Sequence, residues 1–526
     1  MKKNLIYIFD TTLRDGAQAE GISFTVEDKI NIARTLRDFG IHYIEGGWPG
    51  SNPRDVEFFS RMKKISLAPS KLTAFGSTRR KNIKPSEDRN LIDILAAEPD
   101  AFCIFGKTSL MHVKVALETT PEENLKMIQD SVKFLKRTGK EVIYDAEHFF
   151  DGYAENADYA ILTLSSAVKG GAEWISLCDT NGGTMPERIT ELTNIVRKNF
   201  RGVKLAIHAH NDCGLAVANS LAAVDAGAEM VQGTLNGWGE RCGNADLSAV
   251  IANLILKKKK VIANFTKKNL KHLVRTSRYI DEVANIISDK SASFTGASAF
   301  AHKGGVHVSA VMKNASTYEH IAPAAVGNER RILVSDLSGR ANLKVKSRQM
   351  NIDLKDRKTS ADILNDIKKR ELRGYQYEAA DASLKILMRK HTGRMPDFFD
   401  IINCRVILEY ANERKKYSKK CEASVKLIIK DSPVYEVAEG DGPVNALDNA
   451  LRKALLPFYP QVGQIALTDF KVRVLNPKEA TAAAVRVFIE SKDNEELWTT
   501  VGVSEDVIEA SWEALLDSIL YKLLKE

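Results

Sequence analysis

Eight short runs of β-forming residues constrain the fold of this chain more than any other feature of the sequence. They lie about 25 to 40 residues apart in the first half of the chain. The intervals, such as residues 25–40 and 214–229, place apolar residues at helical spacing. Nearly continuous apolar strands are typical of strands buried on both faces, so repeated strand and helix units predict a closed (β/α)8 TIM barrel. The runs read LIYIFD, YIEGGW, LTAFGS, AFCIFG, EVIYDAE, WISLCDT, LAIHAHND and MVQGTLNGW.

The chain after the barrel has a different pattern. We expect the barrel to occupy residues 1–275, followed by a helical linker region over 276–395 and a C-terminal α+β domain over 396–526. In the last part, residues 439–455 and 501–519 each place a small, turn-prone stretch before an amphipathic helix. This internal repeat indicates a domain built from two similar halves.

Composition excludes several classes of protein. With 526 residues, 44% hydrophobic and 27% charged, the chain is long enough for two or three globular domains. The net charge of +8 does not indicate nucleic-acid binding, because the basic run 257–260 ends an apolar helical pattern and other charges alternate in sign. No segment is long enough to span a membrane, and the first apolar run breaks at Asp10, too early for a signal peptide. Six cysteines without a CxxC pair predict free thiols and a cytoplasmic location.

Polar and charged side chains follow the predicted strands. In a barrel of this type the carboxyl ends of all strands meet at one rim, so these residues are predicted to form one site. They are Arg14 and Asp15 after the first run, Glu45 at the second, Glu147 at the fifth, Asp179 and Thr180 at the sixth, His208 and His210 at the seventh, and Glu240 and Asn244 after the eighth.

The seventh run carries the strongest chemical signal. Side chains at positions i and i+2 of a strand share a face, so His208 and His210 can present two imidazoles to one ion. Asp15 follows the first strand, which lies next to the last strands in a closed barrel. Two histidines and one carboxylate predict a site for a divalent cation.

Two long motifs resemble signatures of a known enzyme family. LRDGAQ with Lys29 is similar to the first signature of the α-isopropylmalate, homocitrate and citramalate synthases, and LAIHAHNDCGLAVA is similar to the second. The stretches EGGWPGSNPRD, GERCGNADL and HKGGVH extend the resemblance over the whole chain. It implies a Claisen-type condensation of acetyl-CoA with a 2-oxo acid, dependent on Mn²⁺, Mg²⁺ or Zn²⁺, followed by hydrolysis of the thioester.

The resemblance also implies a role for individual residues. Asp15, His208 and His210 would hold the metal, with Asn244 as a fourth ligand, and Arg14 would stabilise the enolate or alkoxide oxygen; Arg14 could instead serve a salt bridge to Asp15 or Glu45. Gln18 and Glu45 would orient these groups, and Thr180 would bind the substrate carboxylate. Glu147 with His302 would remove the methyl proton of acetyl-CoA, assisted by Tyr318. His307, five residues further on, is the alternative to His302, and Tyr318 could equally serve packing. For Asp179 and Glu240, ligand binding and rim scaffolding both remain open.

The residues of the first motifs are most similar to those of the citramalate synthase branch. That branch implies pyruvate as acceptor, (R)-citramalate as product, isoleucine as feedback inhibitor and a homodimer whose linker reaches over a barrel mouth. Asp145 departs from the apolar or aromatic residue expected two positions before Glu147, which leaves the acceptor pocket open. The alternatives are a 2-isopropylmalate synthase acting on 2-oxoisovalerate, a metal-dependent C–C lyase on the same barrel, and an amino-acid sensor without catalysis.

Overall fold

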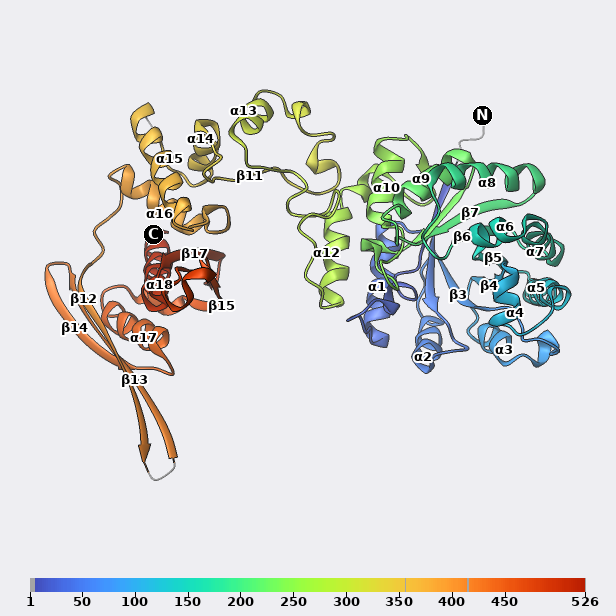
Figure 1. The fold of residues 1–526 in the computed structure, drawn as a ribbon, viewed down its shortest axis with the longest axis horizontal. Helices are drawn as coiled ribbons and strands as arrows, with labels where there is room; N and C mark the ends of the chain where they lie inside the picture. The colour runs from blue at the N-terminus through green and yellow to red at the C-terminus, as the bar shows by residue number, and fades with distance from the viewer. Residues whose placement is uncertain (1–4, 355, 414–415, 526) are drawn as a thin grey trace. The chain divides into compact units, whose positions relative to one another are not determined.

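Eight parallel strands of the computed structural model form a closed barrel, as the spacing of the apolar runs predicts (Figure 1). The structure describes residues 5–354, 356–413 and 416–525. The ring closes because the first strand pairs with both the second and the eighth. The strands are β1 (Leu5–Asp10), β2 (Tyr43–Gly47), β3 (Lys71–Ser77), β4 (Ala101–Lys107), β5 (Glu141–Glu147), β6 (Trp174–Asp179), β7 (Lys204–Ala209) and β8 (Met230–Gly233). A short strand, β9 (Val261–Ile262), adds to β1 outside the ring.

Helices surround the barrel and bury their apolar faces against it. The first begins at a capping box, in which Thr25 and Asp28 satisfy each other's backbone N–H groups, and ends at Gly40 with a φ of 102°. Its buried face includes Ile30, Ala33 and Leu36. The helices are α1 (Val26–Phe39), α2 (Pro53–Met62), α3 (Arg89–Ala96), α4 (Leu110–Val115), α5 (Pro121–Lys136), α6 (Phe149–Glu155), α7 (Ala157–Gly170), α8 (Pro186–Asn199), α9 (Ala216–Ala226), α10 (Leu247–Leu256), α11 (Lys267–Leu270) and α12 (Leu273–Val283).

The interior of the barrel is packed, and aromatic rings fill the layer near the amino-terminal ends of the strands. Tyr7 and Tyr43 lie edge-on to Trp174, with ring centroids 5.3 and 6.4 Å from it. Trp174 and Phe9 are fully buried. This filling closes the lower part of the barrel and leaves the carboxyl ends of the strands as the place for a site.

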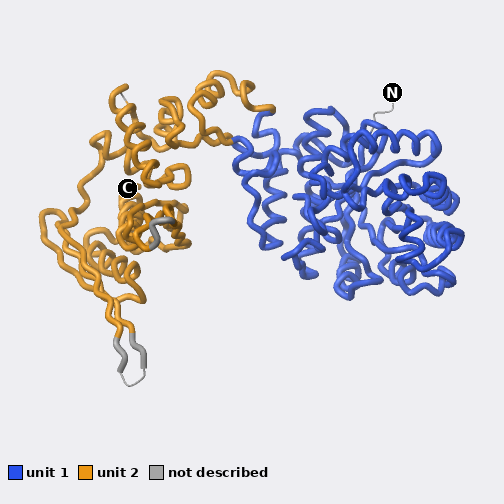
Figure 2. Tube along the Cα trace, viewed as in Figure 1, with its two compact units in different colours: residues 1–300, 321–329 blue, residues 301–320, 330–526 orange. Residues whose placement is uncertain are grey.

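The chain divides into two compact units (Figure 2). Residues 1–300 with 321–329 form unit 1, which contains the barrel, and residues 301–320 with 330–526 form unit 2. The helices expected over 276–395 are present, and most of them belong to unit 2. Its first elements are β10 (Ala301–His302), α13 (Gly305–Lys313), β11 (Arg331–Ile332), α14 (Arg340–Gln349), α15 (Arg357–Leu372) and α16 (Asp381–His391).

The C-terminal part of unit 2 contains the repeat seen in the sequence. Each half is a three-stranded antiparallel sheet followed by one helix. The first half consists of β12 (Asp400–Glu413), β13 (Lys416–Ile429), β14 (Ser432–Glu439) and α17 (Pro443–Leu455), and the second of β15 (Ala466–Val474), β16 (Val485–Lys492), β17 (Leu497–Ser504) and α18 (Val507–Leu523). The C-terminal α+β architecture is therefore confirmed. Within the part of the chain that the structure describes, every helix is too short or too polar to cross a lipid bilayer.

Candidate active site

The loop after β1 is tied down by a buried aspartate. Asp10 accepts hydrogen bonds from the backbone N–H and the hydroxyl of Thr12, at 2.9 and 3.0 Å. The Thr12 hydroxyl in turn accepts a bond from the backbone N–H of Leu235, which follows β8, at 2.9 Å. Burial raises the pKa of Asp10 to about 7. These bonds fix the segment that carries Arg14 and Asp15 against the end of β8.

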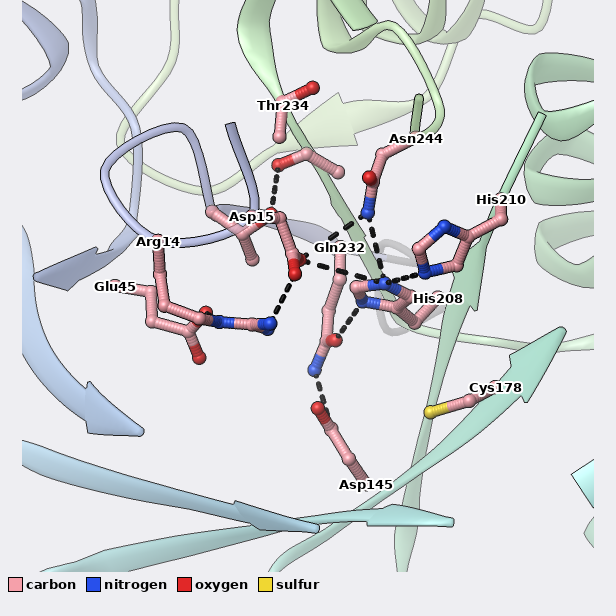
Figure 3. A network of polar contacts seen from close by, with 12 residues as sticks. Arg14, Asp15, Glu45, Asp145, Cys178, His208, His210, Gln232, Thr234 and Asn244 are labelled. Atoms are coloured by element: carbon pink, nitrogen blue, oxygen red, sulfur yellow. Dashed lines mark hydrogen bonds and ion pairs between the residues drawn. The ribbon is translucent and has the colours of Figure 1, made fainter. Parts of the chain in front are cut away.

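The predicted metal ligands lie together at the barrel mouth (Figure 3). The Nε2 atoms of His208 and His210 are 3.3 Å apart, and Asp15 Oδ2 lies 3.7 Å from His208 Nε2. Asn244 Nδ2 is 3.0 Å from the same nitrogen and 3.3 Å from Asp15 Oδ2. Burial and the neighbouring His208 lower the pKa of His210 to about 3, which keeps this imidazole neutral and able to bind a cation.

These donors fit a divalent cation by chemistry and spacing. Ligands bonded at about 2.0 to 2.2 Å around one ion are separated by about 3.0 to 3.5 Å, close to the separations among Asp15, His208 and His210. His210 Nδ1 and Asn244 Oδ1 are buried without a hydrogen-bond partner. Among the described residues no three His, Cys, Asp or Glu side chains form a ready-made metal cluster. A cation would therefore draw the Asp15 carboxylate, which also pairs with Arg14, slightly toward the imidazoles.

Arg14 makes both of the salt bridges that the sequence left as its alternatives. Its Nη1 contacts Asp15 Oδ1, and its Nε donates to Glu45 Oε2 at 2.6 Å. Its guanidinium carbon lies 3.7 Å above the centre of the Phe75 ring. Burial opposes ionisation of Asp15, but the positive charge of Arg14 and the interactions with the neighbouring imidazoles outweigh it and hold the pKa of Asp15 below the usual value. Arg14 is thus a fixed cation beside the metal ligands, and the ion pairs are compatible with a catalytic role.

Glu147 lies on the same mouth, at the end of β5. It faces Lys107, its register partner at the end of β4, and the two side chains form an ion pair. The next residue, His148, has a left-handed backbone with a φ of 59° and donates its N–H to the Thr180 hydroxyl at 2.8 Å. The Thr180 oxygen accepts this bond through a lone pair, so its own O–H hydrogen can still donate to a bound carboxylate.

One cavity of about 190 Å³ joins these groups. Arg14, Asp15, Gln18, Glu147, Thr180, His208 and His210 all line it. Three aromatic side chains that the sequence did not single out form one wall: Phe75 and Phe105 are stacked at 5.4 Å, and Trp48 meets each of them edge-on at 5.6 Å. Trp48 directly follows β2, and Phe75 and Phe105 lie two residues before the ends of β3 and β4, so aromatic residues near the ends of three consecutive strands were the available signal.

One polar residue inside the barrel, Gln232, was also missed as part of the site. Gln232 on β8 joins His208 to Asp145 on β5, the residue that departs from the family pattern. Burial raises the pKa of Asp145, although the interaction with His208 and the hydrogen bond from Gln232 act in the opposite direction. A glutamine in the middle of an otherwise apolar strand was the signal in the sequence.

The two remaining rim residues, Asp179 and Glu240, differ in their contacts. Asp179 accepts hydrogen bonds from the Thr184 hydroxyl at 2.7 Å and from Asn219 at 3.4 Å, which is the scaffolding arrangement. Glu240 lines the cavity with a side chain that is 57% exposed and lies 4.0 Å from Arg241. It therefore remains available to a ligand.

The other predicted catalytic residues belong to unit 2. His302 Nε2 lies 3.2 Å from Glu319 Oε1, and Glu319 also pairs with Arg330. The ring of Tyr318 stacks on His307 at 4.1 Å, and its side chain is half-exposed. In unit 2, His302 therefore contacts Glu319, and Tyr318 contacts His307. Glu147 belongs to unit 1.

Three family models match successive parts of the chain. Residues 5–280 match the HMGL-like family, residues 294–373 the homocitrate synthase post-HMGL domain-like family, and residues 378–523 the LeuA allosteric (dimerisation) domain. A barrel with a polar mouth, followed by these two regions, therefore defines an HMGL-like enzyme with an allosteric dimerisation domain. The HMGL-like family typically depends on a divalent metal.

Curated relatives narrow the class. The chain is 52% identical over 522 residues to "(R)-citramalate synthase" of Aquifex aeolicus, covering 99% of this chain and 98% of that protein, and 53% identical over 525 residues, with the same coverage, to the enzyme of that name from Geobacter sulfurreducens. It is 32% identical over 517 residues to "2-isopropylmalate synthase" of Methanocaldococcus jannaschii, covering 98% of this chain and 94% of that protein. The chain belongs to the (R)-citramalate synthase family.

Proposed function

We propose that this chain condenses acetyl-CoA with pyruvate and hydrolyses the resulting thioester to give (R)-citramalate and CoA. The observation that carries this proposal is the convergence of Asp15, His208 and His210 beside Arg14 in the cavity of about 190 Å³, in a chain about half identical to (R)-citramalate synthases over its full length. A small cavity with two imidazoles, a carboxylate and a fixed guanidinium suits a small 2-oxo acid. The relatives span the same full length, so neither a lyase nor a sensor is favoured.

Asp15, His208 and His210, with Asn244 as a fourth donor, would hold the divalent cation. When bound, such a cation polarises the carbonyl of the 2-oxo acid and stabilises the alkoxide that forms at it. The neutral state of His210 supports this assignment, because an imidazolium cannot ligate a metal.

Arg14 supplies positive charge to the oxygen that becomes negative. Its guanidinium is held between Glu45 and Asp15 and cannot lose its proton at any relevant pH, so it needs no reorganisation as charge develops. Glu45 serves as the residue that orients Arg14. Gln18, which also lines the cavity, and the free hydroxyl hydrogen of Thr180 are placed to bind the substrate.

Glu147 removes a proton from the methyl group of acetyl-CoA. Its carboxylate lines the cavity at the end of β5, pairs with neither a metal-ligand residue nor Arg14, and is held by Lys107. His302 completes this base and Tyr318 assists it, both contributed by the region after the barrel. The protein acts as a homodimer, in line with its LeuA dimerisation domain.

The acceptor is selected by size. Trp48, Phe75 and Phe105 form one side of the cavity with rigid rings, and we expect this wall to accept a methyl group more readily than a branched side chain. One added methylene in an apolar pocket changes discrimination by about 1 to 3 kcal/mol. The aromatic wall therefore favours pyruvate over 2-oxoisovalerate.

The LeuA domain provides feedback control, with isoleucine as the effector. The two similar halves of this domain start their helices at Pro443 and Val507, and backbone N–H groups at helix starts bind carboxylates. All six cysteines lie in described segments and none forms a disulfide, which suits the reducing cytoplasm in which we place the enzyme.

The test measures release of CoA thiol by the full chain with Mn²⁺ or Mg²⁺ and acetyl-CoA. We expect rapid release with pyruvate, slow release with 2-oxoisovalerate, (R)-citramalate as product, and inhibition by isoleucine. A reaction without acceptor is the control, because Cys213, Cys242 and Cys404 are exposed and react with thiol reagents. No release with either acid contradicts synthase activity, and faster release with the branched acid assigns the chain to 2-isopropylmalate synthesis.

A further inference from the structure

A chain of hydrogen bonds crosses the barrel interior from the metal ligands to the opposite wall (Figure 3). His208 Nδ1 lies 2.8 Å from Gln232 Oε1, and Gln232 Nε2 donates to Asp145 Oδ1 at 2.9 Å. The exposed fractions of the three residues are 5%, 1% and 4%.

The topology explains why three distant segments meet. His208 and Gln232 are register partners on the adjacent strands β7 and β8. Asp145 lies on β5, which is separated from β8 by two strands in the sheet order, so its contact with Gln232 spans the interior of the barrel. Side chains that point inward from non-neighbouring strands meet in this way in closed barrels.

The donors and acceptors in these hydrogen bonds determine the tautomer of His208. The two ends of a glutamine amide differ, since Nε2 only donates and Oε1 only accepts. Asp145 Oδ1 accepts from Gln232 Nε2, as a carboxylate oxygen or as the carbonyl oxygen of the protonated acid, and this turns Oε1 toward His208. Nδ1 of His208 must then carry the hydrogen, which leaves the lone pair on Nε2, the atom that faces Asp15 and His210.

Burying the carboxyl group of Asp145 costs free energy, which indicates that the arrangement serves a function. A carboxyl group that is 4% exposed loses most of its hydration, and apolar side chains of equal volume would pack the same space at lower cost. Asp145 is surrounded by donors that satisfy it, Gln232 and the Cys103 thiol. Groups that hold the second nitrogen of a ligating histidine commonly change metal affinity by about 10- to 100-fold when they are removed.

We propose that Asp145 is a positioning residue which acts through Gln232 to hold His208 as its Nδ1–H tautomer, with Nε2 ready to bind the divalent cation. Asp145 therefore sets the affinity of the site for the cation without touching it. This inference rests on the proposed metal site.

The test measures the Kd of Mn²⁺ for the full chain without substrate, from the electron paramagnetic resonance signal of free Mn²⁺. Gln232→Leu and Asp145→Leu should each raise the Kd by about 10-fold or more. Because Asp145 acts only through Gln232, the double variant should bind Mn²⁺ within about twofold of Gln232→Leu alone. Thr163→Val, which removes a buried hydroxyl bonded to Ala160 O on α7, is the control for general loss of stability and should leave the Kd unchanged.

An isosteric exchange separates polarity from packing. In the double variant Gln232→Glu with Asp145→Asn, the residue at 232 still accepts from His208 Nδ1 and the residue at 145 donates to it, so tight Mn²⁺ binding should be retained. Additive losses in the Leu double variant, or an exchange variant as weak as the Leu variants, would overturn the relay. An unchanged Kd in both folded single variants would also overturn it. If the unmodified chain binds no Mn²⁺, the proposed metal site fails, which is a distinguishable result.

Discussion

Arg14 and Glu45 form a buried ion pair, with Nε and Oε2 2.6 Å apart, at the mouth of a barrel whose metal-ligand candidates lie beside the same guanidinium. Glu45 is fully buried, and burial raises its pKa in spite of Arg14. A buried pair of this kind is weak evidence for a stabilising role, so we propose that it orients the Arg14 guanidinium.

Replacing Arg14 should therefore impair turnover more than binding. We expect Arg14→Lys to lower kcat by about 100-fold, because an ammonium cannot contact Glu45, Asp15 and the substrate oxygen together. Steady-state kinetics with pyruvate give the result, and the Kd of Mn²⁺ should stay within a few-fold. Arg61→Lys, at an exposed pair with Glu27, is the matched control. An Arg14→Lys enzyme with normal kcat would remove Arg14 from the chemistry.

Glu147→Gln tests the base. The amide keeps the size of the side chain but cannot take a proton, so kcat should fall by about 100- to 10,000-fold while the KM for pyruvate changes little. Exchange of the methyl hydrogens of acetyl-CoA with deuterated water, followed by mass spectrometry, should fall in parallel. Glu155→Gln, on α6 and bonded to the Ser109 hydroxyl, is the control. Unchanged exchange would assign proton removal to another group.

Phe105→Ala should widen acceptor choice. Removing a ring that stacks on Phe75 at 5.4 Å opens space on the aromatic wall. We expect the ratio of kcat/KM for 2-oxoisovalerate to that for pyruvate to rise by about 10-fold. Phe134→Ala, a partly buried ring that packs outside the cavity, controls for general loosening. A ratio that does not change would mean that the wall does not select the acceptor.

Unit 2 should become less stable as pH rises from about 4 to about 7. Burial raises the pKa of Asp517 on α18 to about 7, above its ordinary value of 3.8, although the Ser383 hydrogen bond acts in the opposite direction. The folded state therefore holds a proton that the unfolded state releases, so the stabilisation is complete below about pH 4 and is lost as pH passes 7. Because Asp517 lines a cavity, we expect a change of about 1 to 2 kcal/mol.

Calorimetry of the full chain between pH 4 and 8 measures this trend. Asp517→Asn should flatten it and raise the Tm of the unit 2 transition at pH 8. Asp362→Asn, an exposed residue of α15, should leave the trend in place. The same slope in Asp517→Asn as in the unmodified chain would exclude Asp517 as its origin.

The barrel and the core of the site could be predicted because their signals are local. Alternation of apolar strands and helices follows from hydrogen bonding and burial within short segments, and the two-residue spacing of His208 and His210 puts both imidazoles on one face. Because the carboxyl ends of all barrel strands meet at one rim, Asp15, Glu45 and Glu147 could be assigned to one site without any knowledge of long-range contacts.

Other parts of the site depend on contacts between distant strands. The stacking of Phe75 on Phe105 and the double pairing of Arg14 depend on side-chain directions at neighbouring strand ends, which residue type alone does not give. The salt bridges of Arg14 to Asp15 and to Glu45 are both present, because one guanidinium has donors enough for both neighbours.

By itself the sequence determined a (β/α)8 barrel with a candidate metal site, a helical region and a two-part α+β domain, since periodicity and spacing are properties of short segments. Only the tertiary structure decided that Asp145 meets Gln232 across the barrel and that His208 is held through it. The reason is physical: strand closure sets which inward-facing side chains share the interior, and strands separated by two others in the sheet meet there only once the ring is complete.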